Sequence, residues 1–258
     1  MEKPTEVRDL NEGDLLRIGC DPCFATRILK LLSDEEQLDW YVETGSKKAC
    51  YPVSRLGENY PQRLRDKLAL DAPACLWAKG DLGVLNRPMV ALVGSRDLDE
   101  ANKAFAKEVG KQAALRGYAL VSGNARGADQ VAQDSCLQHG GYVVSFLADE
   151  LWNKAENEKV LYLSDDGFDL PFSSIRALSR NRLIHSMAEK TFVAQCSLVK
   201  GGTWSGTVQN LRHGWSSVFC FADGSQAMTE LEQRGAKQIT IEDLNAFEDL
   251  QPDTLKLF

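Results

Sequence analysis

The amino-acid sequence predicts an α/β protein in which helices cover both faces of a parallel sheet. Three observations carry this prediction. From Met89 onward, short apolar runs alternate with amphipathic segments, which is typical of right-handed β–α–β units. The 258 residues are enough for one or two domains with a hydrophobic core. With 43% hydrophobic and 26% charged residues, the composition excludes wholly disordered and low-complexity proteins.

Apolar runs of four to six residues are the expected strands. They lie at 89–93, 118–121, 142–147, 191–194 and 218–221, with a short strand at 237–239. Helices are expected at 99–116, from about 128 to 139, at 173–187, after Thr207 and within 228–247. Residues 1–50 form a small helical N-terminal region, with two short helices broken at Cys20-Asp21-Pro22, and 51–88 is a loop-like stretch that opens the main domain, 51–258.

Sequence features also limit the location and the chemistry of the protein. No apolar run is long enough to span a membrane, and the N-terminus has no secretory signal, so we expect a cytoplasmic protein. Seven scattered cysteines do not make a disulfide framework, and reduced thiols are expected. Cys20 and Cys23 lack a second pair at zinc spacing, so neither a metal nor a cofactor is predicted.

Charge is distributed unevenly along the chain. The formal net charge is −7, yet the segment 172–216 holds six bases and one acid, Glu189. Its bases are Arg176, Arg180, Arg182, Lys190, Lys200 and Arg212. A local excess of +5 in an acidic protein indicates recognition of an anion such as phosphate, although a solvated helix face is the alternative.

Glycine-bearing loops follow the first two expected strands, at the sheet edge where open α/β sheets bind ligands. The candidate phosphate-binding residues there are Gly94, Ser95 and Arg96 after the first strand, and Ser122, Gly123, Arg126, Gly127 and Asp129 after the second. Glycine lets backbone N–H groups approach an anion, and hydroxyls and guanidinium groups donate to its oxygens. Neither a Gly-x-Gly-x-x-Gly nor a P-loop motif is present, which argues against dehydrogenases and P-loop NTPases.

A third loop is expected at 201–207, just before a helix, and an arginine-rich segment precedes the fourth strand. The candidates from these segments are Gly202, Thr203, Ser205, Gly206, Thr207, Arg180, Asn181 and Arg182. Among the arginines, Arg96, Arg126 and Arg182 are the expected ligand contacts, unless one of them instead ties down the loops. Trp204 and Trp215 are expected either to stack on bases or to lie in the core.

Taken in order, these motifs resemble the DNA-processing protein A family, also called DprA or Smf. The resemblance covers roughly 55–247. Its motifs are Tyr60-Pro61 with Leu64, the stretch 73–80, Val93-Gly94-Ser95-Arg96, the stretch 122–129, Arg180-Asn181-Arg182-Leu183-Ile184, and Gly235-Ala236 before Glu242-Asp243-Leu244. The chain departs from the family pattern at Ala132-Gln133, where Ala-His is usual, and is too short for the winged-helix domain that many members carry.

The resemblance implies an extended Rossmann-like domain that binds single-stranded DNA without strong sequence preference. It also implies a homodimer formed through the C-terminal half and assistance to a RecA-type recombinase in natural transformation or recombination. Apolar residues that agree with such an interface are Leu231, Ile239, Ile241, Leu244 and Phe247, although they also suit the core of the domain itself.

Two other functions remain open. One is a sensor of a nucleotide-derived small ligand, as in a defence or mobile-element system. The other is an enzyme similar to the phosphoribohydrolases that activate cytokinins. In those enzymes a catalytic glutamate stands three residues after a Gly-Thr pair, whereas Asn210 stands three residues after Thr207. An amide supplies neither the charge nor the proton acceptor that N-glycosidic cleavage needs, so we expect no catalytic residue.

Overall fold

The computed structural model describes residues 11–252, and the chain divides into two compact units, Met1–Tyr51 and Pro52–Phe258. The helices of the first unit are α1 (Glu12–Arg17), α2 (Pro22–Ser33) and α3 (Glu35–Ser46). Asp21 accepts a hydrogen bond from the Phe24 backbone and Pro22 opens α2, which explains the predicted break at this point. The sequence does not predict α3, whose N-cap is Asp34.

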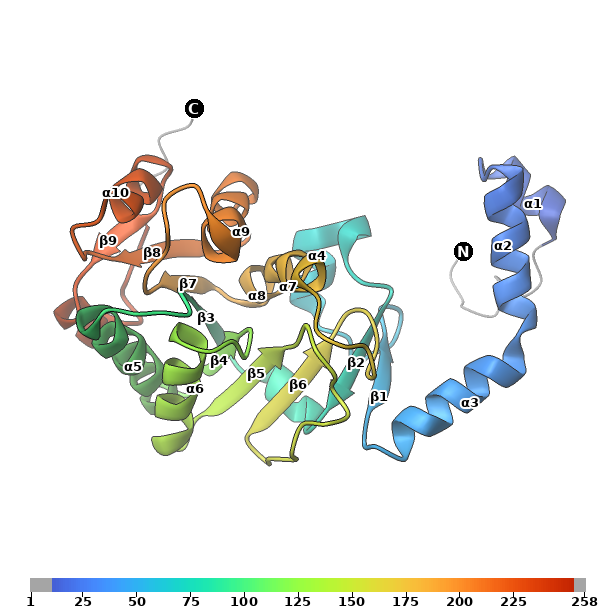
Figure 1. Ribbon diagram of the computed structural model, residues 1–258, viewed down its shortest axis with the longest axis horizontal. Coiled ribbons are helices and arrows are strands. Elements are labelled where there is room, and N and C mark those ends of the chain that lie inside the picture. Colours follow the sequence, from blue (N-terminus) through green and yellow to red (C-terminus); the bar gives the residue numbers. More distant parts are fainter. Residues whose placement is uncertain (1–10, 253–258) are drawn as a thin grey trace. The chain divides into compact units, whose positions relative to one another are not determined.

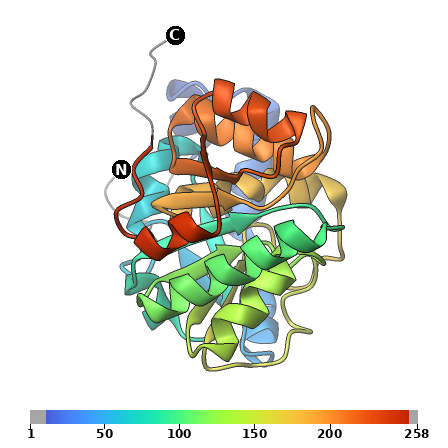
Figure 2. The same ribbon diagram turned by 90° about the vertical axis from the view of Figure 1, so that its left-hand side faces the viewer.

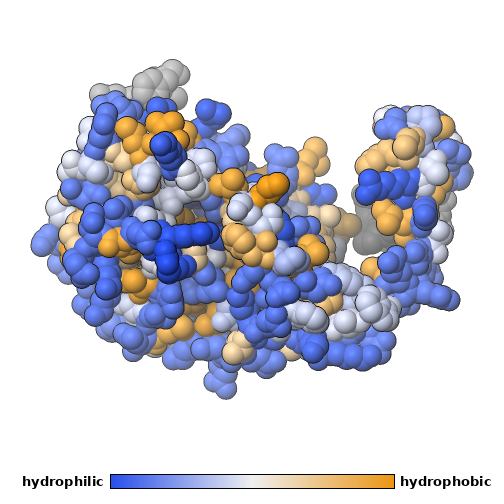
Figure 3. Space-filling model, viewed as in Figure 1, coloured by the Kyte–Doolittle hydropathy of each residue, from blue (hydrophilic) through white to orange (hydrophobic). Residues whose placement is uncertain are grey.

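The helical unit leaves many large apolar side chains in solvent. Its buried residues include Leu15 and Ala25, whereas Ile18, Leu31 and Trp40 are each more than half exposed. Figure 3 shows such hydrophobic patches among hydrophilic side chains. This unit therefore buries little apolar surface within itself.

The second unit is built on a nine-stranded sheet with the order β1-β2-β6-β5-β4-β3-β7-β8-β9 (Figure 1). The strands are β1 (Tyr51–Ser54), β2 (Cys75–Lys79), β3 (Met89–Val93), β4 (Ala119–Ser122), β5 (Tyr142–Phe146), β6 (Val160–Ser164), β7 (Lys190–Val193), β8 (Ser217–Phe221) and β9 (Lys237–Ile239). From β6 to β9 all neighbours pair in parallel, while β2 pairs with β6 in the antiparallel sense. The mixed α/β class with a parallel sheet is thus confirmed.

Helices cover both faces of this sheet (Figure 2). On one face lie α5 (Glu100–Leu115), α6 (Ala128–Gln138) and η4 (Glu242–Ala246); on the other lie α4 (Gln62–Leu68), α8 (Asn181–Met187), α9 (Gly201–His213) and α10 (Gln226–Gln233). In β3, Val90 and Leu92 join the core beneath α5, whereas Ala91 joins the opposite core. This alternation follows from the two-residue period of a strand.

The structure corrects the sequence prediction at several elements. Strands β1 and β2 lie in the stretch that the sequence predicts as a loop. The sequence predicts no strand at the position of β6. Strand β2 pairs in the antiparallel sense with β6, a strand from far along the chain, so the pattern of parallel strand–helix–strand units does not identify it. The predicted helix at 173–187 is two helices, α7 (Ser174–Ser179) and α8, that meet at Arg180. The predicted loop at 201–207 is the beginning of α9, which starts at Gly201.

The C-terminal apolar residues expected at a dimer interface lie mostly inside the domain. Leu231, Ile239, Leu244 and Phe247 are buried in its two cores, and Ile241 packs against one of them. Of the two expectations for these side chains, the structure therefore favours the second, that they belong to the core of the domain. Among the described residues, no helix is both long and apolar enough to cross a membrane.

Candidate functional site

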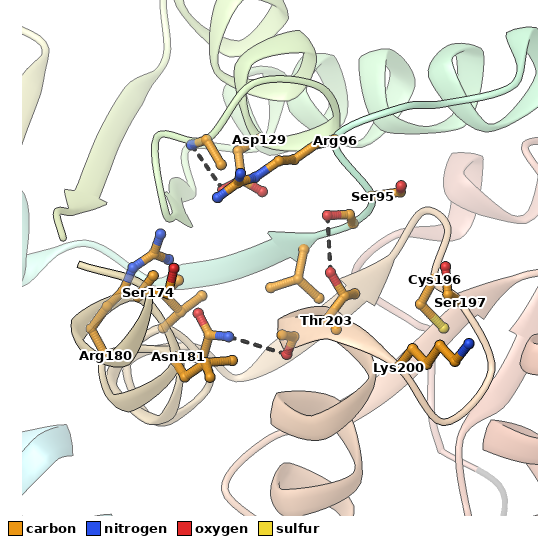
Figure 4. A pocket seen from close by; sticks show the side chains of 18 of the residues that line it. Ser95, Arg96, Asp129, Ser174, Arg180, Asn181, Cys196, Ser197, Lys200 and Thr203 are labelled. Atoms are coloured by element: carbon orange, nitrogen blue, oxygen red, sulfur yellow. Dashed lines mark hydrogen bonds between the residues drawn. The ribbon is translucent and has the colours of Figure 1, made fainter. Parts of the chain in front are cut away.

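A pocket of about 430 Å³ opens at the carboxyl ends of β3 and β7. It lies where the strand order reverses, since the chain proceeds from β3 through β4 and β5 on one side and through β7 and β8 on the other. Ligands of open α/β sheets bind at such switch points. Figure 4 shows polar residues from three segments around this pocket: Ser95 and Arg96 after β3, Arg180 and Asn181 at the α7–α8 corner, and Lys200 and Thr203 around the start of α9.

Gly94 sets the position of the loop after β3. A Cβ at Gly94 would collide with the Cβ of Ala128, the first residue of α6, so only glycine fits here. The Thr203 hydroxyl donates a hydrogen bond to the Gly94 carbonyl at 3.0 Å, and the Ala128 amide donates to the Ser95 carbonyl at 3.1 Å. The loop is therefore fixed between α6 and α9.

Asp129 and Arg180 hold the loop after β4. The buried Asp129 carboxylate accepts hydrogen bonds from the backbone amides of Gly123, at 3.0 Å, and Ala125, at 3.2 Å. The Arg180 guanidinium, also buried, donates to the Gly123 carbonyl at 2.8 Å. Burial raises the pKa of Asp129 and lowers the pKa of Arg180, while each charge opposes the shift of the other. The two residues thus carry opposite buried charges and both bond to the loop after β4, which forms part of the pocket wall.

The remaining cations of the pocket, Arg96 and Lys200, make no salt bridge with any residue of the described part of the chain. The Arg96 guanidinium lies 5.9 Å from the ring centre of Phe172, which also lines the pocket and is 56% exposed. One cation without a salt bridge, Arg96, thus stands beside an exposed aromatic ring, and a second, Lys200, lines the same pocket. Such a surface suits a phosphate with an attached flat group.

His185 lies at the floor of the pocket and is almost completely buried. Burial lowers the pKa of its imidazole to about 3, so the ring is neutral near pH 7. Its Nδ1 lies 3.3 Å from the Thr191 hydroxyl. A neutral ring with this partner belongs to the packing beneath the pocket and adds no charge to it.

Half of the sequence-predicted residues meet at this pocket. Those that line it are Gly94, Ser95, Arg96, Asp129, Arg180, Asn181, Gly202 and Thr203. Gly123 and Gly127 shape the loop behind it, because a Cβ at either position would collide with Arg180 or with the carbonyls of Ser95 and Arg96. Asn181 donates a hydrogen bond to the Gly202 carbonyl at 3.1 Å and so joins α8 to α9.

The other predicted residues lie elsewhere. Arg126 is exposed and forms an ion pair with Asp97 at 3.0 Å, while Arg182 lines a neighbouring cavity. Ser122 and Thr207 are completely buried. Ser205 lies on the exposed side of α9, where its hydroxyl donates to the carbonyls of its own helix, and Gly206 packs against α8.

Sequence reasoning missed Phe172, Ser174, Ser197 and Lys200 as lining residues. Lys200 belongs to the basic segment 172–216 and immediately precedes Gly201. These two features of the sequence could have identified it as a residue of the site. Phe172 gave no comparable signal, because an isolated aromatic residue after a proline has no periodic pattern. Only the fold places it beside Arg96.

The structure also settles the interpretation of several other residues. Trp204 and Trp215 are each 7% exposed and belong to the core. Asn210 is buried, donates to the Ser216 hydroxyl at 2.9 Å and accepts from the Ser216 amide at 2.9 Å. It therefore connects the end of α9 to β8 and lies outside the pocket lining. No group of three or more His, Cys, Asp or Glu side chains within 11–252 is arranged to hold a metal ion.

Fold and pocket together define the class: a Rossmann-like α/β protein with a cationic pocket at the switch point of its sheet. Comparison with known proteins gives the family. A family model described as DNA recombination-mediator protein A matches residues 53–248. The DNA processing protein DprA of Streptococcus pneumoniae is 30% identical over 203 residues, which cover 72% of this chain and 70% of that protein. The chain belongs to the DNA recombination-mediator protein A family.

Solved structures agree with this assignment. The X-ray structure of DprA from Streptococcus pneumoniae matches with a TM-score of 0.76 and 27% identity, covering 92% of this chain and 87% of that one. The structure of DNA processing protein A from Helicobacter pylori matches with a TM-score of 0.64 and 21% identity, covering 78% of this chain and 97% of that one. The second match supports the fold alone.

Proposed function

We propose that this protein binds single-stranded DNA through the pocket at the ends of β3 and β7. The observation that carries the proposal is the position of Arg96 beside the exposed ring of Phe172, in a pocket that Lys200 also lines. Neither cation has a salt-bridge partner among the described residues. The cations neutralise backbone phosphates, and the ring stacks on a base. This combination of charge and stacking is how proteins bind single strands without reading their sequence.

The proposed contacts follow from the position of each side chain. Ser95 and Asn181 line the pocket and can donate to phosphate oxygens through the Ser95 hydroxyl and the second amide proton of Asn181. Thr203 holds the loop after β3 through its bond to the Gly94 carbonyl. Arg180 and Asp129 act mainly by holding the loop after β4. Arg126, 73% exposed beyond the pocket, is available to a strand that extends past the loop after β3.

A polymeric ligand is favoured over a free mononucleotide for two reasons. Phe172 is more than half exposed at the pocket, which leaves its ring open to a base outside an enclosed cavity. In addition, the Helicobacter pylori relative is described by its single-stranded DNA binding mode. A sensor of a small nucleotide is the alternative, and the dependence of affinity on oligonucleotide length distinguishes the two.

The family description supports a role as a recombination mediator. Assistance to a RecA-type recombinase and formation of a homodimer are further parts of the proposal, which the resemblance of the sequence motifs suggests. The interface of that dimer must use residues other than the buried C-terminal apolar set. Light scattering of the purified protein tests the dimer. Co-purification with a RecA-type recombinase, in the presence and absence of oligo-dT, tests the partner.

We further propose that the protein is not an enzyme. Asn210 is engaged with Ser216, and the Asp129 carboxylate is already held by two backbone amides. Neither group is free to activate water. Incubation with AMP, followed by chromatography for free adenine, tests this proposal, and turnover that disappears in Asp129→Asn would overturn it.

The experiment for DNA binding is a fluorescence-anisotropy titration of labelled oligo-dT. We expect Arg96→Ala and Lys200→Ala each to weaken binding, while Lys107→Ala, an exposed cation on α5, leaves it unchanged. Equal affinity of all four proteins would place the DNA elsewhere.

A further inference from the structure

A second cavity, of about 460 Å³, lies on the other side of the α7–α8 corner from the first pocket. The two cavities share one lining residue, Leu178, which is 52% exposed. Around it the side chains alternate: Arg180 and Asn181 line the first pocket, whereas Ser179 and Arg182 line the second cavity. The boundary between the cavities is therefore no wider than one turn of helix.

An aromatic stack forms one wall of the second cavity. The imidazole of His213 lies parallel to the indole of Trp215, with ring centres 4.8 Å apart and an interplanar angle of 6°. Trp215 is buried and His213 is exposed, so the imidazole forms the outer layer of the stack. A third flat ring can continue such a stack on the solvent side.

Two cations, Arg182 and Lys67, also line the cavity. Arg182 is held by hydrogen bonds to the carbonyl of Ser179, at 3.0 Å, and to its hydroxyl, at 3.2 Å, and lies 3.6 Å from the Asp165 carboxylate. Lys67 donates to the Ala188 carbonyl at 2.7 Å and has no salt bridge to any described residue. Asp71 is a second acid and lines the cavity, so two acids stand near its two cations. Lys67, which forms no ion pair with either acid, is the cation that remains open to a phosphate.

We propose that the second cavity is a further nucleotide subsite for the strand bound in the first pocket. The strand crosses the corner over Leu178, one base stacks on the outer face of His213, and the adjoining phosphate lies near Lys67 and Arg182. This inference rests on the proposed function and deepens it. It assigns His213, Gln209 and Lys67, from α9 and α4, to a binding surface outside the pocket at the switch point.

Oligo-dT of graded length tests the subsite on the full chain. For the shortest oligonucleotides that bind measurably, His213→Ala and Lys67→Gln should match the unchanged protein. For longer ones, which reach the second cavity, each variant should bind about tenfold more weakly. Arg212→Ala is the matched control, because this exposed cation neighbours His213 on α9 but lines neither cavity, and should match at all lengths. His213→Phe keeps a flat ring and should retain the affinity.

Variants that bind every length like the unchanged protein would overturn the subsite. Variants that weaken all lengths equally would also overturn it, because the effect would not depend on reaching the second cavity. Failure of the proposed function looks different: Arg96→Ala would then leave the binding of even the shortest oligonucleotide unchanged. The melting curve of each variant is measured to check that it folds. If His213→Ala does not fold, two variants still test the subsite: His213→Phe should keep the affinity for long oligonucleotides, and Lys67→Gln should lower it.

Discussion

The Arg180 guanidinium donates a hydrogen bond of 2.8 Å to the Gly123 carbonyl, although the two residues are 57 positions apart in the chain. This bond joins the loop after β4 to the corner between α7 and α8. A Cβ at Gly123 would overlap the guanidinium, so the glycine is needed for close approach rather than for an unusual backbone angle. The pocket therefore depends on a long-range contact between two segments that both belong to family motifs.

Gly123→Ala should destabilise the protein and weaken binding of oligo-dT. The added methyl group forces Arg180 to move, and overpacking of this kind costs about 1–3 kcal/mol. Thermal unfolding and anisotropy titration measure the two effects. In an Arg180→Ala background the same substitution should cost much less, since the colliding side chain is gone. Additive costs would show that the two residues do not interact.

Arg180→Met should be destabilising, because it removes the hydrogen bond to the Gly123 carbonyl and one of the two cations, Arg180 and Arg96, whose charges act on the buried Asp129 carboxylate. Loss of a hydrogen bond made by a charged group costs about 1.5–3 kcal/mol. The double variant Arg180→Met, Asp129→Asn removes the carboxylate charge and should recover part of the unfolding free energy. Urea titrations compare the variants. A double variant less stable than Arg180→Met alone would contradict the charge-pair account.

Phe172→Ala should weaken binding of oligo-dT while leaving the melting temperature almost unchanged. The ring is 56% exposed, so its removal affects the core little. Stacking of a base contributes ~1–3 kcal/mol, which corresponds to roughly 5- to 150-fold in affinity. Phe172→Trp should preserve binding. Ile175→Ala, at an exposed residue outside the pocket lining, is the control and should bind like the unchanged protein.

The stability of the protein should fall as the pH drops from 6.5 toward 3, with His185 as one cause. Its pKa is about 3 in the folded state and near 6.5 when unfolded, so the unfolded chain takes up the proton first. The contribution is therefore complete above pH 6.5 and is lost below it, at up to about 1.4 kcal/mol per pH unit. His185→Asn should show a flatter dependence in urea titrations between pH 7 and 4. An unchanged slope would contradict the burial argument.

Sequence reasoning anticipated the centre of the fold better than its edges. The run at 89–93 is buried on both faces, as central parallel strands are, and this gives a continuous apolar signal. The β2 strand pairs with β6 in the antiparallel sense, so it does not belong to a parallel β–α–β unit with β6, and the pattern used for the other strands does not mark it. At Gly201 the glycine and hydroxyl residues indicated a loop, but packing of α9 against α8 favours a helix there.

The candidate site was anticipated where a motif stands next to a strand end. Gly94, Ser95 and Arg96 follow β3 directly, so their position at the pocket follows from topology alone. Arg126 and Arg182 have the right chemistry, but their side chains are directed by tertiary contacts, to Asp97 and Asp165 respectively. Such ion pairs leave no trace in local sequence patterns.

The most direct test of the central claim is the salt dependence of oligo-dT binding by the unchanged protein and by Arg96→Ala, Lys200→Ala. For the unchanged protein, log affinity should fall linearly with log salt concentration, with a slope of about −0.7 for each phosphate contacted. The double variant should bind more weakly and show a slope shallower by roughly one contact for each cation removed. Equal slopes and equal affinities for the two proteins would contradict the assignment of this pocket as the DNA-binding site.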